Sequence, residues 1–409
     1  NRTTNFFTSL IPAIRTEFSV LLRQDLLRGF GKADAEYEIE ISRNNQDITA
    51  EEFRERVTDI IVQAQDRYWE LDYAVNDLEV RKKALEYAET VLDQNQARFE
   101  VGTASRLEVV EAEAEVAARR EELIRAQFTY RRVQDALVQM ISDFEDPWRF
   151  KGQIVPVVDI DVSDLPEEPF ERLMELAGEL RPEIQREDLN IANYMVSLER
   201  SRNHLRPTLQ LVAGYQWFGL GGNNIVRDYS GDNFFDAPII DIIPGGFGDA
   251  MSQMLGGSFG GYIVGLNLQL PIKNVESRAV NAKAQIDLRR AEMNKQAVRQ
   301  KVGLEVRDAL TQVQMNKARL EASQATVRAE AERLQGEEAR FEVGMGTTRL
   351  LIEAQRDLLT AKSVEVRART ELIKSHALLD KVVGRTFREH NIRLNDALET
   401  NVKDPTAQN

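Results

Sequence analysis

The fold follows from one stretch that occurs twice, as Ala97-Arg98-Phe99-Glu100-Val101-Gly102 and as Ala339-Arg340-Phe341-Glu342-Val343-Gly344. The copies are 242 positions apart, counted from Gly102 to Gly344. The same spacing aligns further residues on both sides, among them Ile60 with Val302, Glu111-Ala112 with Glu353-Ala354 and Leu137 with Leu379. An identical hexapeptide in a register without gaps indicates an internal duplication.

Proline marks the boundaries of the two duplicated segments. None occurs between residues 13 and 146 or between 272 and 404, whereas nine of the eleven prolines lie between these segments. Because proline breaks a helix interior, both segments are predicted to be helical. A helix from about Lys32 to Val101 would measure roughly 105 Å at ~1.5 Å per residue, longer than a globular core requires. The repeated glycine predicts a turn that folds each segment into an antiparallel helix pair.

Between the helical segments, the hydrophobic residues recur with a period of two. Thr208–Trp217 and Tyr262–Leu270 each alternate between an apolar and a more polar side, which is typical of strands. Phe18–Leu26 alternates too and takes in the first copy the place of Tyr262–Leu270 in the second. Strands of about nine or ten residues suit a membrane-spanning sheet, although a soluble sheet packed on a helix fits the alternation equally well. The Gly-, Asn- and Asp-rich stretch Phe218–Gly261 is expected to be a long exposed loop.

The composition excludes several classes of function. The net charge of −14, with basic residues interspersed among acidic ones, argues against a nucleic-acid partner. The chain has no cysteine, which excludes a disulfide framework, a cysteine zinc site and a thiol nucleophile. The three histidines lack metal-ligand spacing and are expected on helix surfaces, as are the many acidic residues near Arg and Lys. No nucleotide-binding or catalytic motif appears. We therefore expect no enzymatic activity, no cofactor and no metal.

Four features together carry a resemblance to a known family. They are the repeated Phe-Glu-Val-Gly turn followed by Glu-Ala, the sequence Arg181-Pro182-Glu183 at a helix start, Arg206-Pro207 before a strand, and Gln24-Asp-Leu-Leu-Arg-Gly-Phe-Gly31. As a set, these motifs resemble the TolC family of outer-membrane efflux and secretion channels over nearly all of residues 18–395. The resemblance implies a mainly α fold with a small β part. Long antiparallel helical hairpins would form an α-barrel tunnel, and strands of three chains would share an outer-membrane β-barrel.

The resemblance also implies a division of the chain into segments. Residues 1–31 would hold a loop and a barrel strand of an N-terminally incomplete first repeat, 32–143 its helical hairpin and 144–164 an equatorial linker. Residues 165–206 would form a helix of the second repeat, 207–271 a β-hairpin with a long extracellular loop, 272–384 a helical hairpin and 385–409 an equatorial tail. The first copy lacks counterparts of the helix around Leu165–Asn203 and of the strand Thr208–Trp217. We therefore expect the chain to begin inside the loop between the first two strands.

A gate is expected where the tunnel narrows beyond the repeated turns. In the family, acidic residues six and nine positions after the second glycine can line the constriction; here these positions hold Leu350 and Glu353, and the first copy has Glu108 and Glu111. A ring of like charges selects ions by focusing the electric field. Arg349 is a candidate partner of one carboxylate in a closed state, and Leu350 a candidate for apolar closure. A plain solvated helix face is the alternative for the glutamates.

The turns themselves are candidate contacts with a periplasmic adaptor protein, as the resemblance implies. Glycine allows a partner backbone to approach closely, and its neighbours supply apolar area. The alternative is a helix C-cap without a partner. The residues concerned are Val101, Gly102 and Thr103 in the first copy and Val343, Gly344 and Met345 in the second.

The sequence thus predicts a passive homotrimeric exit duct of a tripartite efflux pump or type I secretion system. Its expected place is the outer membrane of a Gram-negative-type envelope, extending into the periplasm. The expected partners are outer-membrane lipid, a periplasmic adaptor and, indirectly, an inner-membrane transporter, with no nucleic acid. The alternative hypothesis is a soluble coiled-coil scaffold, because such a protein also needs long amphipathic helices.

Overall fold

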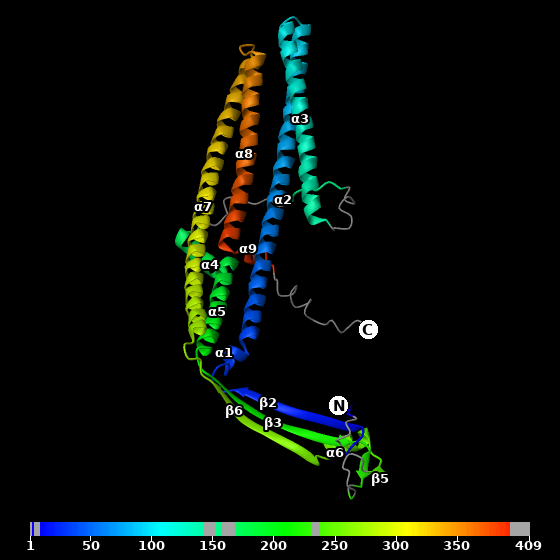
Figure 1. The fold of residues 1–409 in the computed structure, drawn as a ribbon. Coiled ribbons are helices and arrows are strands. Elements are labelled where there is room, and N and C mark those ends of the chain that lie inside the picture. The colour runs from blue at the N-terminus through cyan, green and yellow to red at the C-terminus, as the bar shows by residue number, and fades with distance from the viewer. Residues whose placement is uncertain are drawn as a thin grey trace. The chain divides into compact units, whose positions relative to one another are not determined.

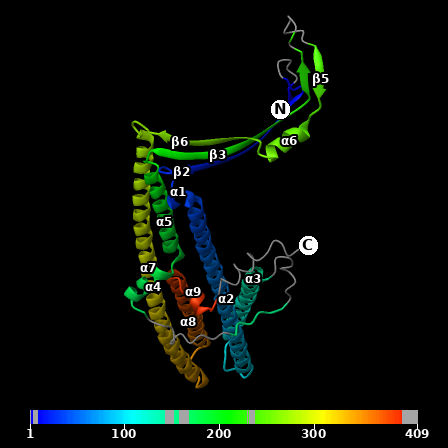
Figure 2. The same ribbon diagram turned by 90° about the horizontal axis from the view of Figure 1, so that it is seen from below.

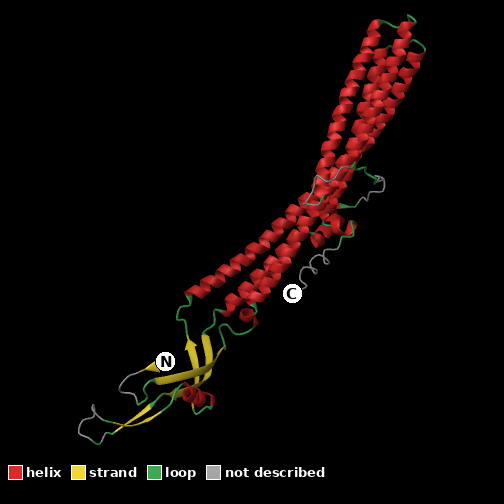
Figure 3. Cartoon of the chain, turned by 90° about the vertical axis from the view of Figure 1, so that its right-hand side faces the viewer, coloured by secondary structure: helices red, strands yellow, loops and turns green. Residues whose placement is uncertain are grey.

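The computed structural model of the chain describes residues 2–3, 9–142, 152–157, 168–228, 230 and 238–392. It divides into two compact units, Asn1–Asn44 with Asn190–Glu292 and Asn45–Leu189 with Met293–Asn409. Most of the expected equatorial linker at 144–164, and the part of the expected tail after residue 392, lie outside the described residues. Every strand within the described ranges, drawn yellow in Figure 3, belongs to the first unit.

Two pairs of long helices confirm the hairpins expected from the duplication. The first pair is α2 (Tyr37–Glu100) and α3 (Arg106–Ile141), preceded by the short α1 (Lys32–Ala35); the second is α7 (Val275–Glu342) and α8 (Thr348–Val383), followed by α9 (Thr386–Glu389). In each pair the two helices run side by side (Figure 1). Ion pairs bridge the partners, such as Arg120–Glu89 at 3.3 Å and Arg333–Asp357 at 2.7 Å. The expected start at Lys32 holds, but the helix is interrupted at Glu36.

The helix expected around Leu165–Asn203 is two helices, α4 (Phe170–Leu180) and α5 (Pro182–Asn203). The break falls at Arg181, because the residue before a proline is disfavoured in a helix while proline itself suits the first helical position. Arg181 is 7% exposed. Its guanidinium binds Glu183 and Glu305 at 2.7 Å each and donates to the Val382 carbonyl oxygen at 3.1 Å. This arginine therefore joins α4 and α5 to α7 and α8.

The largest core of the second unit lies where α4 meets α7 and α8. Leu173, Val306, Ala368 and Val383 are each 0% exposed in this cluster. On α7 the buried residues Val302, Val306, Ala309 and Val313 recur at helical spacing, so they form one face turned toward this cluster. Full burial of such a side chain contributes roughly 1.5–3 kcal/mol. The core therefore fixes the base of the second hairpin.

Four of the described strands form an antiparallel sheet in the order β1 (Arg2–Thr3), β2 (Ala13–Asp25), β3 (Thr208–Gly221) and β6 (Phe259–Gln269). All three sequence-predicted strands are present, with β2 beginning earlier and β3 ending later than the alternation indicated. The register pairs Phe18 with Trp217 and Ala213 with Val264, so the apolar residues of all three share one face. On that face Val264 is 73% and Leu22 60% exposed. The single chain leaves this apolar surface open.

The expectation of a loop over Phe218–Gly261 was wrong for most of the residues that the structure describes there. β3 continues to Gly221, and a small ribbon follows, made of β4 (Asn224–Arg227) and β5 (Ile239–Ile243). The nine-residue helix α6 (Phe247–Leu255) then packs against β2 and β3 (Figure 2). Three of the described glycines in this stretch, Gly219, Gly221 and Gly222, lie at close contacts between backbones. No helix within the described residues has the length and apolarity needed to cross a membrane.

Candidate functional site

Both helical hairpins end in the same turn. Gly102 and Gly344 each have a φ of 78°, the left-handed conformation that glycine adopts without strain. Thr103 N donates to Arg98 O, and Met345 N to Arg340 O, each at 2.8 Å. These bonds satisfy carbonyl groups at the ends of α2 and α7, as in a Schellman motif. A β-carbon on either glycine would meet no atom within 4 Å, so the backbone alone requires glycine here.

The helices that follow the turns begin with equivalent caps. Ser105 Oγ accepts from Glu108 N at 3.3 Å at the start of α3. Thr347 Oγ1 accepts from Leu350 N at 3.4 Å at the start of α8. Such caps satisfy amide groups that the first helical turn leaves open. The duplication thus preserves the backbone while Glu108 and Leu350 differ at the same position.

The six residues predicted to contact an adaptor lie at these turns, where several apolar side chains are strongly exposed. Val101 is 74%, Val343 70% and Met345 80% exposed. Thr103 is also exposed, and its hydroxyl donates to Arg98 O at 3.0 Å. Exposed apolar side chains clustered at one end of a helix are typical of a protein contact.

The predicted gate residues lie in the first two turns of α3 and α8. Glu353 and Arg349 are exposed, Leu350 is 44% exposed, and Glu108 and Glu111 are half-buried. Within the described part of one chain, Arg349 forms no ion pair with these carboxylates. A pair across two chains, and the gate itself, stay predictions.

The two hairpins are packed together just behind the turns. Val91 of α2, Phe341 of α7 and Leu351 of α8 form a buried cluster. The Arg98 guanidinium lies 4.6 Å from the centroid of the Phe341 ring, a cation–π distance. Phe341 therefore belongs to the repeated hexapeptide and also to the contact between the hairpins, a role that the repeat alone did not reveal.

Tyr87 adds a hydrogen bond to this contact. Its hydroxyl donates to Glu338 Oε1 at 2.5 Å. Burial and the adjacent Glu338 carboxylate raise the pKa of Tyr87, so the hydroxyl keeps its proton. The bond therefore links α2 to α7 as a neutral donor to a charged acceptor, which is stronger than a bond between neutral groups.

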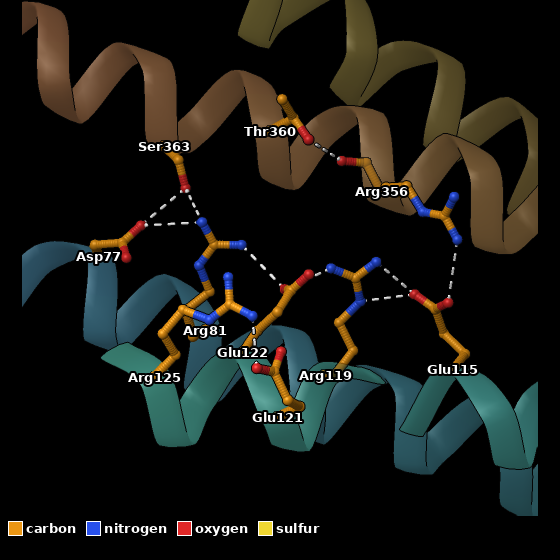
Figure 4. Close-up of polar contacts among 10 residues, drawn as sticks. All are labelled: Asp77, Arg81, Glu115, Arg119, Glu121, Glu122, Arg125, Arg356, Thr360 and Ser363. Carbon is orange, nitrogen blue, oxygen red and sulfur yellow. Dashed lines mark hydrogen bonds and ion pairs between the residues drawn. The ribbon is translucent and has the colours of Figure 1, made fainter. Parts of the chain in front are cut away.

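Further from the turns, a chain of charged side chains connects three helices (Figure 4). Arg119 of α3 pairs with Glu115 at 2.6 Å and with Glu122 at 2.7 Å. Glu115 also accepts from Arg356 of α8 at 3.3 Å, and Glu122 pairs with Arg81 of α2 at 3.1 Å.

The same chain of contacts reaches α8 at a second point, Ser363. Arg81 donates to Ser363 Oγ at 3.2 Å, and Ser363 donates to Asp77 Oδ1 at 3.0 Å. Residues of α2, α3 and α8 are therefore held in one network, which we call the interhairpin network: Asp77, Arg81, Glu115, Arg119, Glu122, Arg356 and Ser363.

The sequence reading missed this network because it assigned such charges to solvated surfaces. Arg119 is 6% and Glu115 9% exposed, which corrects that expectation for both. The spacing of four residues between them is also the spacing of ordinary surface pairs. A possible signal was the small residues around them, since Ala112 and Ala126 leave room for a facing helix. His376 is likewise buried, at 8%, rather than on the helix surface.

A second ionic contact joins α2 to α8 nearer the base of the hairpins. Glu70 accepts from Arg367 at 2.9 Å and from Lys374 at 2.7 Å. Burial raises the pKa of the Glu70 carboxyl, but the hydrogen bonds and positive charges of Lys374 and Arg367 outweigh it and hold the pKa below its usual value. The pKa of Lys374 is raised by Glu70 and Asp66 in spite of burial. Both groups stay charged at neutral pH.

Comparisons with known proteins identify the architecture. A family model described as outer membrane efflux protein matches residues 22–142 and 173–385, more than half of the chain. No curated protein matches the chain.

Solved outer-membrane channels share the fold at low sequence identity. CusC, described as forming a transmembrane channel, is 15% identical with a TM-score of 0.68, over 91% of this chain and 82% of CusC. The outer-membrane channel OprN is 14% identical with a TM-score of 0.66, over 92% and 82%. The CmeC outer membrane channel of Campylobacter jejuni is 15% identical with a TM-score of 0.63, over 97% and 82%. With duplicated hairpins, matching turns and an exposed apolar sheet face, the chain belongs to the outer membrane efflux protein family.

Proposed function

We propose that the protein is the passive exit duct of a tripartite efflux pump or a type I secretion system, working as a homotrimer in the outer membrane. The family is one of outer-membrane channels, and its members are not enzymes. Three copies of the sheet β2–β3–β6, with further strands, would surround a pore, and the hairpins would line a tunnel in the periplasm. The soluble scaffold considered from the sequence finds no support in this family membership.

The observation that carries the proposal is the pair of equivalent turns with exposed apolar residues. Val101, Val343 and Met345 surround glycines whose open side a partner backbone can approach, as an adaptor docking site requires. The adaptor would link the duct to an inner-membrane transporter. The division of the chain into barrel, tunnel and equatorial segments is part of the same proposal.

The proposal of a gate at the turns is based on the contacts that join the two hairpins. The interhairpin network and the Phe341 cluster both connect the first hairpin to the second within one chain. Opening the tunnel would require these contacts, or contacts between chains, to change. Glu353 is proposed to line the constriction as a ring of carboxylates, with Leu350 next to it, while Glu108, Glu111 and Arg349 would line or pair near it.

Two measurements on the purified protein test the proposal together. Native mass spectrometry should give three chains per particle, and planar bilayers should show ion conductance that is low until the hairpin contacts are loosened. Expression in cells that lack their own exit duct should restore export of a toxic compound. A monomer without conductance, recovered from the soluble fraction, would refute the duct and favour the scaffold.

A further inference from the structure

Helix α6 is held against the sheet by contacts between backbones. A β-carbon at Gly219 would lie 1.8 Å from the Ala250 carbonyl oxygen, and one at Gly221 would lie 2.1 Å from that of Gly246. Thr16 Oγ1 donates to Ala250 O at 3.0 Å. Only glycine permits so close an approach. The helix is therefore fixed to β2 and β3 rather than carried loosely by a loop.

The end of β3 shows why a helix lies there. β6 begins at Phe259, which pairs with Phe218, so β3 extends beyond its neighbour. The Leu220 N–H in this extension donates to Gln253 Oε1 of α6 at 3.1 Å. The helix thus supplies a hydrogen-bond acceptor to a backbone N–H of β3 at an edge that β6 does not cover.

The face of the sheet that α6 covers is the apolar one. Thr16 pairs with Gly219, and two positions along, Phe18 pairs with Trp217. Because side chains alternate along a strand, these pairs lie on the same face. The rings of Phe18 and Trp217 are 5.5 Å apart, and Tyr215 lies 4.5 Å from Trp217. The helix therefore lies directly beyond an aromatic cluster, at the loop end of the sheet.

The apolar side of the helix is covered only in part within the described chain, where Met251 and Met254 are half-buried. Phe247, Met251, Met254 and Leu255 follow the spacing of one helix face, and Phe247 is 58% and Leu255 76% exposed. Ser252 is exposed and lies at the border of this face, three positions before Leu255. α6 contains neither Lys nor Arg, and its one carboxylate, Asp249, accepts from Gly246 N at 2.7 Å.

We propose that α6 is an interfacial helix whose stripe Phe247–Met251–Met254–Leu255 inserts into the lipid surface, level with the aromatic side chains of the sheet. The inference rests on the proposed function, because the apolar sheet face must itself meet lipid. Lipid is favoured over a second protein surface because the stripe continues the exposed apolar face of the sheet, and because it offers no charge for pairing. Amphipathic helices with apolar stripes lie in this way at the membrane boundary, where aromatic residues also gather.

The absence of cysteine allows a direct test. Spin labels are placed on F247C, L255C, S252C and V264C in the full-length protein, reconstituted in vesicles of phosphatidylethanolamine and phosphatidylglycerol. Collision with oxygen, which concentrates in lipid, is compared with collision with a water-soluble nickel chelate. Labels at 247 and 255 should respond mainly to oxygen, and the label at 252, at the border of the stripe, should respond more strongly to nickel than these two.

The label at 264 distinguishes failure of the interfacial helix from failure of the proposed duct. An oxygen response at 264 with nickel access at 247 and 255 would overturn the interfacial helix and leave the duct standing. Shielding of 247 and 255 from both reagents would show that another copy of the chain covers α6, which also overturns it. Nickel access at 264 would remove the sheet from lipid, and with it both proposals.

Discussion

Thr348 Oγ1 donates to Asn95 Oδ1 at 3.1 Å, across the contact between the two hairpins. Thr348 is 1% and Asn95 0% exposed, and Asn95 Nδ2 has no hydrogen-bond partner among the described residues. The bond therefore joins the end of α2 to the first turn of α8 just behind the turns, where a polar pair is costly unless satisfied. Any motion of the second turn against the first hairpin has to break it.

T348V should loosen this contact. It leaves Asn95 Oδ1 buried without its donor, at a cost of about 1–3 kcal/mol. Replacing both partners, in N95L with T348V, should recover most of that loss because no polar atom stays unpaired. Hydrogen exchange of the amides at 348–355 would measure both effects. Equal destabilisation by the single and the double variant would contradict the role given to the pair.

Substitution of either turn glycine should strain the backbone and reduce export. G344V forces a β-branched residue into φ 78° at a cost of about 1–2 kcal/mol and fills the open side of the turn. We expect export to fall while the oligomer stays intact, with G102V acting in the same direction. G336A is the matched control, since that glycine lies inside α7 with open space around it and alanine favours helix. Unchanged export in both turn variants would remove the adaptor contact.

The acidic gate predicts a change of ion selectivity. E353Q removes one exposed carboxylate per chain, or three in a trimer, so the preference for cations in planar bilayers should fall. E332Q, on an exposed position of α7, should leave the preference as it is. Equal reversal potentials in E353Q and the unaltered protein would assign Glu353 to a solvated face.

The interhairpin network predicts a large difference between two neighbouring arginines. R119M strips a buried guanidinium from Glu115 and Glu122, and breaking a buried pair costs about 3–5 kcal/mol. R120M removes an arginine that is 62% exposed, and an exposed pair contributes about 0–1 kcal/mol. Thermal unfolding should separate the two variants. Bilayer conductance should also rise in R119M if the network holds the hairpins closed, and similar melting of both variants would dismiss the network.

Acid should weaken the contact at Glu70. The pKa of this carboxyl is lower in the folded chain than its ordinary 4.5, so the stabilisation is present above 4.5 and is lost as the pH falls through the folded value. E70Q should therefore lower the melting temperature at neutral pH and show a shallower decline in acid. E89Q, in a half-exposed pair with Arg120, should show little change. Parallel melting curves of E70Q and the unaltered protein across this range would refute the assignment.

Much of the fold could be predicted from the sequence because it depends on local hydrophobic periodicity and on the positions of proline and glycine. The absence of proline over 13–146 and 272–404 and the repeated glycines predicted two hairpins, and alternation predicted β2, β3 and β6. Backbone conformation at Gly102 and Gly344 is a local property, so identical hexapeptides produced identical turns. α6 was missed because it is short and its glycine-rich flanks are typical of loops. Arg181-Pro182-Glu183 was recognised as a helix start, which α5 confirms, but the preceding α4 was not separated from it, because both lie in one continuous helical pattern.

The sequence by itself determined the elements, their duplication and the chemical character of each face, since these depend on residues a few positions apart. Only the tertiary structure decided which charges are buried. Glu115 and Arg119 have the same spacing as a solvated pair, but they are buried where α3 contacts α8, and Arg356 of α8, 241 residues away from Glu115, donates to Glu115. Likewise, nothing near Asn95 indicated Thr348, because packing between hairpins brings together residues that the chain order keeps apart.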